Sequence, residues 1–191
     1  MTDITEFLTK HPLDKRTGTF AEGELEAYRD KIPDELYQFL QQEQKAVYGN
    51  GFFRTVSPKD FHDVFTNWGL DGDNCHAFLV SSFGCIEYYY NNDYCGFNPH
   101  TGTAHANSPS GYLGLLLNLA LVNTTNLEIG FCYDMHLKHR STLPELKEDE
   151  MYTLLPALPL GGDMETSRIE TVRRDVQLDI LAQLYNHKTT E

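Results

Sequence analysis

Lysine and arginine are absent from the middle of this 191-residue chain, between Asp60 and Leu137. The same window holds eight carboxylates and carries a charge of -8 out of a net -13, against -2 for the residues before it and -3 for those after it. A surface of one sign attracts partners of the opposite sign and speeds encounter with them. The charge pattern therefore predicts a basic protein as partner and argues against direct binding to nucleic acid.

Long apolar runs are missing as well. The most apolar stretch, Leu113 to Val122, is interrupted by Asn118 and is far shorter than the roughly 20 residues of a membrane-spanning helix. The first six residues are acidic and contain no apolar stretch, which predicts that no secretory signal is present. With 40% hydrophobic and 23% charged residues, the chain is expected to be a globular cytoplasmic protein that does not enter a membrane.

Cysteine spacing gives no sign of a metal module, because none of the four cysteines forms a C-x-x-C pair. In a reducing compartment we expect free thiols and no cofactor or metal. A hydrolase that uses Cys75 or Cys132 with a histidine stays open as an alternative, because such partners meet only in the folded chain.

Other catalytic and metal-binding templates fail on spacing. Gly49-x-Gly51 lacks the third glycine of a dinucleotide loop and predicts a hairpin turn, and Ser108-Pro109-Ser110-Gly111 lacks the first glycine of a nucleophile elbow. The segment from Asp71 to Asn74 begins like a calcium loop, but Ser82 stands where the twelfth-position glutamate is required. His136 and His139 are expected to be exposed.

Aromatic residues crowd the acidic window, and tyrosines alternate there with carboxylates. Such mixtures suit a recognition surface, because a tyrosine offers a large contact area at little cost in rotamer entropy. The alternative interpretation is a strand whose rings simply fill the core. The predicted partner-binding residues are Asp71, Asp73, Glu87, Tyr88, Tyr90, Asp93 and Tyr94.

Helix and strand signals divide the chain into short elements. We expect helices from 33 to about 47, from 58 to 68 and from 109 to 122, strands at 52–56, 77–83 and 85–90, and a turn-rich stretch at 91–108. A last helix is predicted from apolar residues three or four apart. Its inward residues would be Ile169, Val172, Val176, Ile180 and Leu184, and Trp68 is expected in the core.

Two groups of segments resemble a known pair of bacterial domains. Tyr28 and the segments 32–36 and 48–61 resemble the GAD-like domain. Segments 150–152, 156–162 and 178–184 resemble the small C-terminal domain of unknown function that commonly follows it. Proteins of this type are similar to immunity proteins paired with antibacterial toxins, including DNases delivered by type VI secretion.

The resemblance implies an α+β protein, in which a GAD-like domain of mixed helices and antiparallel sheet (1–123) packs closely against a small helix-rich C-terminal domain (124–191). It also implies a protein that is not an enzyme and that neutralises a cognate toxin by binding it. The charge pattern agrees, because a carboxylate-rich face can occupy the basic surface with which a nuclease binds its substrate. A general nucleic-acid mimic that inhibits another basic protein stays open as an alternative.

Overall fold

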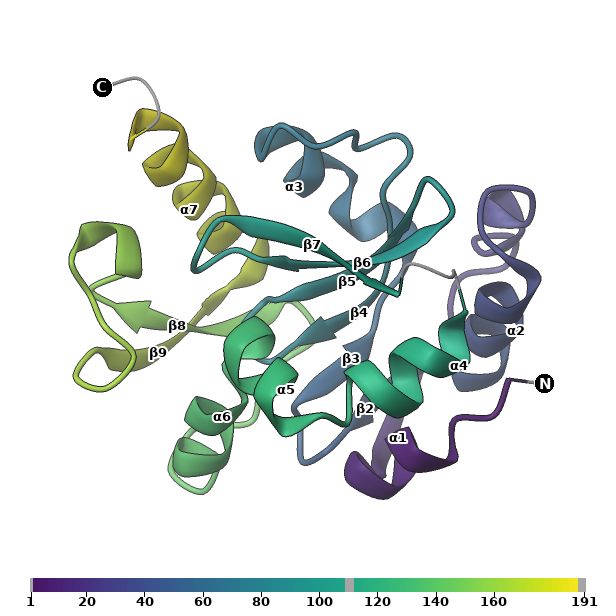
Figure 1. Ribbon diagram of the computed structural model, residues 1–191, viewed down its shortest axis with the longest axis horizontal. Helices are drawn as coiled ribbons and strands as arrows, with labels where there is room; N and C mark the ends of the chain where they lie inside the picture. The colour runs from purple at the N-terminus through teal and green to yellow at the C-terminus, as the bar shows by residue number, and fades with distance from the viewer. Residues whose placement is uncertain (1, 109–111, 189–191) are drawn as a thin grey trace.

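The computed structural model describes residues 2–108 and 112–188. Its centre is an antiparallel sheet of seven strands, each of which lies beside the next strand of the chain (Figure 1). Antiparallel neighbours can be joined by short turns, so this order needs no crossover. The strands are β1 (Leu13–Gly18), β2 (Lys45–Tyr48), β3 (Phe53–Thr55), β4 (His76–Ser81), β5 (Ile86–Tyr90), β6 (Asp93–Asn98) and β7 (Thr103–Ser108).

Helices from two parts of the chain cover one face of the sheet. α1 (Thr5–Lys10), the 3-10 turn η1 (Glu26–Tyr28) and α2 (Asp34–Glu43) precede most of the sheet, and α4 (Leu113–Leu115), the π-helix η3 (Leu116–Ala120) and α5 (Thr124–Phe131) follow it. Phe7, Leu40, Leu117 and Phe131 from these helices share one hydrophobic core with Phe53 of the sheet. Segments before and after the sheet therefore depend on each other for burial.

The other face of the sheet is covered by η2 (Pro58–Phe61), α3 (His62–Asn67) and α7 (Arg174–Lys188). In Figure 1, α3 and α7 lie on the opposite side of the sheet from α1, α4 and α5. Phe65, Val80, Tyr88 and Leu178 meet in the second core, together with Met151 of the C-terminal part.

A small two-stranded sheet forms most of the remaining structure. β8 (Glu150–Leu155) pairs antiparallel with β9 (Arg168–Arg173), with η4 (Leu158–Leu160) in the loop between them, and α6 (Tyr133–His139) follows α5. The backbone N–H of Tyr152 donates to the carbonyl of Ser82 at 2.8 Å, which joins the small sheet to the loop after β4. Phe83, Met135 and Leu154 pack together in a third core at this junction.

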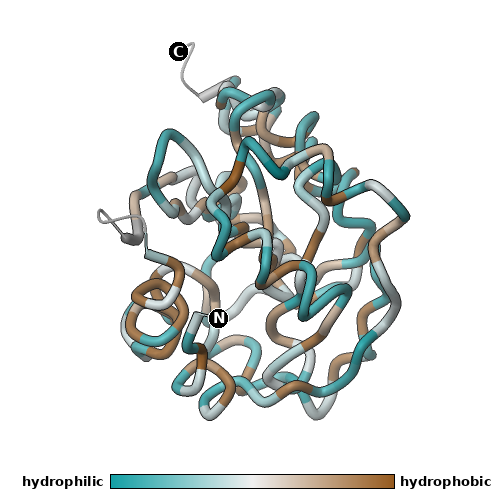
Figure 2. Tube along the Cα trace, turned by 90° about the vertical axis from the view of Figure 1, so that its right-hand side faces the viewer, coloured by the Kyte–Doolittle hydropathy of each residue, from teal (hydrophilic) through white to brown (hydrophobic). Residues whose placement is uncertain are grey.

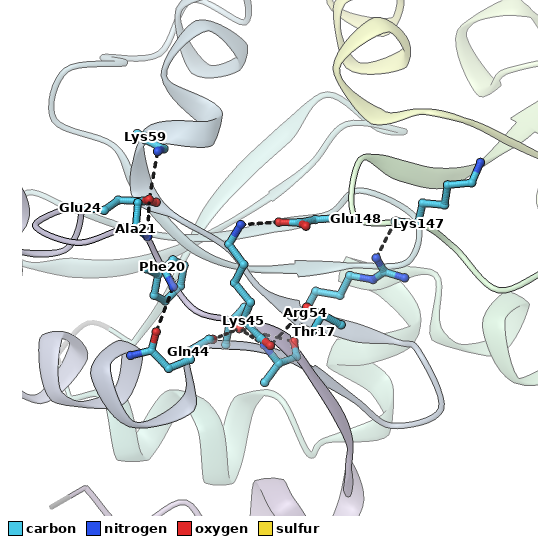
Figure 3. Close-up of polar contacts among 12 residues, drawn as sticks. Thr17, Phe20, Ala21, Glu24, Gln44, Lys45, Arg54, Lys59, Lys147 and Glu148 are labelled. Atoms are coloured by element: carbon cyan, nitrogen blue, oxygen red, sulfur yellow. Dashed lines mark hydrogen bonds and ion pairs between the residues drawn. The ribbon is translucent and has the colours of Figure 1, made fainter.

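Charged side chains of β2 and β3 hold the segment that precedes β8 (Figure 3). Lys45 Nζ lies 2.6 Å from Glu148 Oε1, and the Arg54 guanidinium donates to the backbone carbonyls of Leu146 and Lys147. Arg174 donates to the carbonyl of Glu148 at 3.0 Å. The basic side chains of β2 and β3, Lys45 and Arg54, therefore have their partners within the molecule.

Residues 91–108 are more regular than the sequence predicts, because they form β6 and β7. Asn91 and Asn92 turn the chain within two residues, so most of the stretch is free to pair as strands. The predicted helix at 109–122 is shorter and becomes a π-helix at Leu116, and its residues 109–111 lie outside the described part of the chain.

The predicted inward stripe of the last helix is wrong. Ile169 and Val172 belong to β9, and the helix begins only at Arg174. Val176 and Ile180 are 47% and 45% exposed. The apolar residues that α7 buries are instead Leu178, Leu181 and Ala182, and Gln177 is buried beside them.

Trp68 is only partly buried, at the edge of the second core. Its ring packs against Phe97 at 4.8 Å and Tyr185 at 5.5 Å, measured between ring centroids. Trp68 thus connects the end of α3 to β6 and α7.

The α+β fold class is confirmed, with the helix-rich C-terminal part packed on the sheet. The division at 123/124 stays a prediction, and α5, just after it, buries Leu127 and Phe131 in the core that α1 and α2 share. Within residues 2–108 and 112–188, no helix has the length and apolar character required to cross a bilayer.

Candidate interaction site

A cleft of about 880 Å³ opens where the β5–β6 turn approaches two loops. We call it the acidic cleft. Its walls are residues 30–33 before α2, the loop 71–74 after α3, the start of β4 at His76, and residues 89–92 of the β5–β6 hairpin. These segments are distant in the sequence, and the order of strands in the sheet brings them together.

Asn91 and Asn92 shape the wall that the hairpin contributes. Both have positive φ, 50° and 66°, and they connect the paired residues Tyr90 and Asp93. A two-residue turn with positive φ at both positions matches the right-handed twist of the strands, and asparagine tolerates this conformation well. The turn places Tyr90, which is 36% exposed, at the end of β5 beside the cleft.

Hydrogen bonds within the loop 71–74 stabilise its conformation. Asn74 donates its backbone N–H to the Asp71 carbonyl at 3.1 Å and its side-chain amide to the Asp71 carboxylate at 2.8 Å. A Cβ on Gly72 would lie 2.6 Å from the carbonyl oxygen of His62, so only glycine fits against α3. The tight packing of Gly72 directs Asp71 and Asp73 outward, where both are exposed.

Negative charge dominates the acidic cleft. Asp30, Asp71 and Asp73 line it, against Lys31 as the one lysine or arginine among the described lining residues. The Lys31 ammonium lies 5.5 Å from the centroid of the Tyr28 ring, a favourable cation–π distance.

The pKa values of two histidines beside the cleft are shifted in opposite directions. The exposed ring of His62 contacts Asp63 at 3.0 Å and Asp73 at 3.1 Å, and these two carboxylates raise its pKa. His76 is buried, so desolvation, aided by the charge of Lys31, lowers its pKa. His76 is therefore neutral near pH 7, and its charge does not offset the carboxylates of the cleft.

Three of the predicted partner-binding residues line the acidic cleft, namely Asp71, Asp73 and Tyr90. Asp93 stands opposite Tyr90 in the hairpin and is half-buried. Whether these four residues contact a partner stays a prediction.

The surface placement of Glu87, Tyr88 and Tyr94 is wrong, because all three are buried, at 0%, 4% and 0% exposure. β5 and β6 lie inside the sheet and are covered on both faces, so alternation along them does not lead to solvent. Tyr88 packs on Phe65 of α3, with 4.8 Å between ring centroids. On the other face, Tyr94 donates its hydroxyl to Glu35 at 3.1 Å.

The rest of the acidic window divides between two places. Asp60 and Asp63 are exposed at η2 and α3, whereas Glu128 and Asp134 are exposed on α5 and α6. Figure 1 shows α5 and α6 on the other side of the sheet from α3. Among the aromatic residues of the window, most belong to the cores, and Tyr90 and Tyr112 are the large exposed ones among the described residues.

The sequence interpretation missed the contribution of residues 30–33 and of Asn91 and Asn92. The first segment lies about forty residues before the loop 71–74, and no local pattern links the two. Two consecutive asparagines after an aromatic run were a usable signal, because that pair favours a two-residue hairpin turn.

The cysteines considered for catalysis lie in the interior of the protein. All four cysteines are free and buried, and burial raises the pKa of Cys75 to about 12. Contrary to expectation, His136 is buried; its Nδ1 lies 3.0 Å from the Ser82 hydroxyl, and desolvation lowers its pKa to about 4. In the described part of the chain, no three histidine, cysteine or acidic side chains are grouped as metal ligands.

Comparison with known proteins identifies both halves of the chain and confirms the resemblance seen in the sequence. The model of the GAD-like domain matches residues 3–110, and the model of the C-terminal domain of the T6SS immunity protein Tdi1 matches residues 116–185. The structure is similar to the crystal structure of Atu4351 from Agrobacterium tumefaciens, with a TM-score of 0.76 over 95% of this chain and 89% of that one. At 17% identity this likeness shows the fold alone, and no curated protein matches the sequence. The chain therefore belongs to the GAD-like family, and the segment behind that domain, residues 116–185, matches the C-terminal domain of the T6SS immunity protein Tdi1.

Proposed function

We propose that this protein is a cytoplasmic immunity protein that binds a cognate type VI secretion toxin, of nuclease type, and blocks it through the acidic cleft. The observation that carries the proposal is the gathering of Asp30, Asp71 and Asp73 with Tyr90 around one hollow. The match of residues 116–185 to an immunity-protein domain supports the functional class.

Electrostatics favours this partner. A nuclease must hold a polyanion with lysine and arginine, so its substrate surface is basic. Carboxylates around a cleft speed the encounter with such a surface, and an exposed tyrosine adds contact area once the two proteins meet.

Inhibition by binding, without catalysis, agrees with the chemistry of the cysteines. A cysteine nucleophile acts as thiolate and needs a lowered pKa. The raised pKa of Cys75 is the opposite of this requirement. Cys132 is 3% exposed and lies in the third core, where no substrate reaches it in this structure.

A charge-reversal pair with a matched control tests the cleft. Asp71→Lys with Asp73→Lys changes the net charge as much as Glu128→Lys with Asp134→Lys, and all four residues are exposed members of the same sequence window. The partner to test is the candidate toxin encoded by the gene next to that of this protein, called here the product of the adjacent gene. Its association with the cleft pair, measured by surface plasmon resonance at low salt, should be at least tenfold slower than with the parent protein. The pair on α5 and α6 should slow association far less, since its charges lie away from the cleft.

Equal slowing by both pairs would mean that only net charge matters, and the cleft would lose its role. Binding of many unrelated basic proteins with similar affinity would instead favour the general nucleic-acid mimic.

A titration tests the non-enzymatic mechanism. The toxin should lose its activity near an equimolar ratio, and it should recover that activity after separation from the immunity protein under mild denaturation. Permanent inactivation of excess toxin by a small fraction of this protein would contradict the binding mechanism and return attention to a hydrolase.

A further inference from the structure

The helical segment after β7 presents apolar side chains outward as well as inward. Leu113, Leu116 and Leu117 are buried against the sheet. Tyr112, at 61% exposure, with Leu115 and Leu119, at 44% and 62%, faces solvent instead. These three residues stand three and four positions apart, the spacing that aligns side chains on one side of a helix. In Figure 2 the segment appears as a mainly brown coil next to the grey trace.

One hollow contains this exposed apolar row, and a second hollow shares part of its lining with the first. One, of about 440 Å³, is lined by Leu115 and Leu119 together with Asp3 and Glu35. The other, of about 690 Å³, lies between the N-terminal segment and α2 and shares Thr2, Asp3 and Glu35 with the first. We call the two together the α2–α4 groove.

Charge in the α2–α4 groove has one sign. The described lining of both hollows includes three carboxylates and no lysine, arginine or histidine. Glu43 is 5% exposed and pairs with Arg16 at 3.0 Å, so the carboxylates left for a partner are Asp3 and Glu35. Ile4, Leu8 and Phe39 add apolar surface to the second hollow. The occupant that fits therefore combines apolar side chains with positive charge.

Hydrogen bonds hold the walls of the groove in place. Asn118 accepts from the backbone N–H of Phe7 at 3.1 Å and donates to the Asp3 carbonyl at 2.7 Å. Glu35 accepts from the backbone N–H of Leu113 at 2.6 Å, which fixes the start of α4 on α2. A preformed surface loses little entropy on binding, so its apolar area contributes directly to affinity.

The groove and the acidic cleft lie on two sides of the first turn of α2. Glu35 accepts the hydroxyl of Tyr94, whose ring packs at 5.4 Å from that of Tyr89, and Tyr89 lines the cleft. Pro33 lines the cleft and Glu35 lines the groove, two residues apart. One partner can thus contact both surfaces.

We propose that the α2–α4 groove is a second docking surface for the toxin and receives a segment of it that carries apolar side chains flanked by lysine or arginine. The inference rests on the proposed function, because the toxin is the basic partner that the acidic cleft attracts. The cleft then governs the rate of encounter, and the groove governs the lifetime of the complex.

Uncharged substitutions separate the groove from the cleft. Leu115→Gln with Leu119→Gln removes apolar contact without changing any charge. The matched control, Ile129→Gln with Leu137→Gln, alters residues that are 76% and 41% exposed on α5 and α6. Against the purified product of the adjacent gene, the groove pair should raise Kd at least tenfold, mainly through faster dissociation, and should leave the salt dependence unchanged. The control pair should stay within twofold of the parent protein.

Each other outcome overturns the inference in a recognisable way. If the parent protein binds and the groove pair binds equally well, the groove is not a docking surface and the proposed function stands. If the parent protein does not bind the product of the adjacent gene, both the docking surface and the proposed function are wrong. If sedimentation shows a parent dimer that the groove pair converts to monomer, the occupant is a second copy of this chain. Leu119→Gln alone, at the most exposed of the three positions, decides the matter if the double variant does not fold.

Discussion

Gly72 determines the position of two carboxylates of the acidic cleft although it carries no charge. A Cβ at this position would lie 2.3 Å from the Thr66 hydroxyl and 2.6 Å from the His62 carbonyl, and a backbone carbonyl in a helix does not yield easily. We predict that Gly72→Ala lowers the free energy of unfolding by about 1–3 kcal/mol, the usual cost of forced overpacking. Urea denaturation followed by circular dichroism measures the change.

Gly130 provides the control for this prediction. It lies in α5, and a Cβ there would meet no heavy atom within 4 Å. Alanine should leave stability unchanged or raise it by up to about 1 kcal/mol, because alanine favours helix more than glycine does. A Gly72→Ala variant as stable as Gly130→Ala would show that the loop 71–74 adapts without cost.

Single residues of the acidic window differ in role according to the strand or loop that carries them. Glu87 is paired with Leu79 of β4 and Gly96 of β6, so it lies inside the sheet and is fully buried. Asp73 belongs to a loop, and its side chain is 87% exposed. The same side-chain chemistry therefore serves the interior in one case and the surface in the other.

At the scale of the element, α7 distinguishes inward from outward positions only two residues apart. Leu178 is fully buried in the second core and Ile180 is 45% exposed. Leu178→Ala should lower the free energy of unfolding by about 2–5 kcal/mol, the range for a large aliphatic residue truncated in a core. Ile180→Ala should cost less than about 1 kcal/mol, because little apolar area returns to water.

Thermal melting of the two variants beside the parent protein checks this pair. A larger loss for Ile180→Ala than for Leu178→Ala would reverse the orientation of α7 on the sheet.

The position at which β5 ends and β6 begins determines which residues reach the acidic cleft. Asn91 and Asn92 close the hairpin directly after Tyr90, so Tyr89 and Tyr90 at the end of β5 line the cleft. The earlier residues of the strand, 86–88, are buried. A longer loop would change the pairing register of the hairpin and therefore which of its residues are buried and which are exposed.

At the scale of the whole molecule, buried histidines make the fold sensitive to acid. His11 and His136 are 0% and 2% exposed, and desolvation lowers the pKa of each to about 4. Their ordinary pKa is 6.5, so the unfolded chain binds protons more readily than the folded one below that value. Stability should be unaffected by these groups above pH 6.5 and should fall as the pH drops from 6.5 towards 4, by about 2 kcal/mol for each at pH 5.

Urea denaturation at pH 7.5 and pH 5 measures this loss. His136→Asn should reduce the difference between the two pH values by about 2 kcal/mol, because asparagine does not titrate. A parent protein equally stable at both pH values would contradict the prediction.

The sequence by itself determined the features that depend on near neighbours or on composition. The -8 charge of the window, the start of α2 after Pro33 and the turn at Gly49, Asn50 and Gly51 need only short-range sterics and counting of charges. The order of family motifs likewise predicted the GAD-like domain and its C-terminal companion, and the comparisons confirmed both.

Only the tertiary structure decided which of these residues face solvent. Tyr88, Tyr90 and Tyr94 look alike in the sequence, yet only Tyr90 is exposed, because burial depends on which helices cover each face of the sheet. The acidic cleft likewise requires residues 30–33, 71–76 and 89–92 to meet. Their proximity comes from strand pairing and from packing between distant segments, which no local pattern encodes.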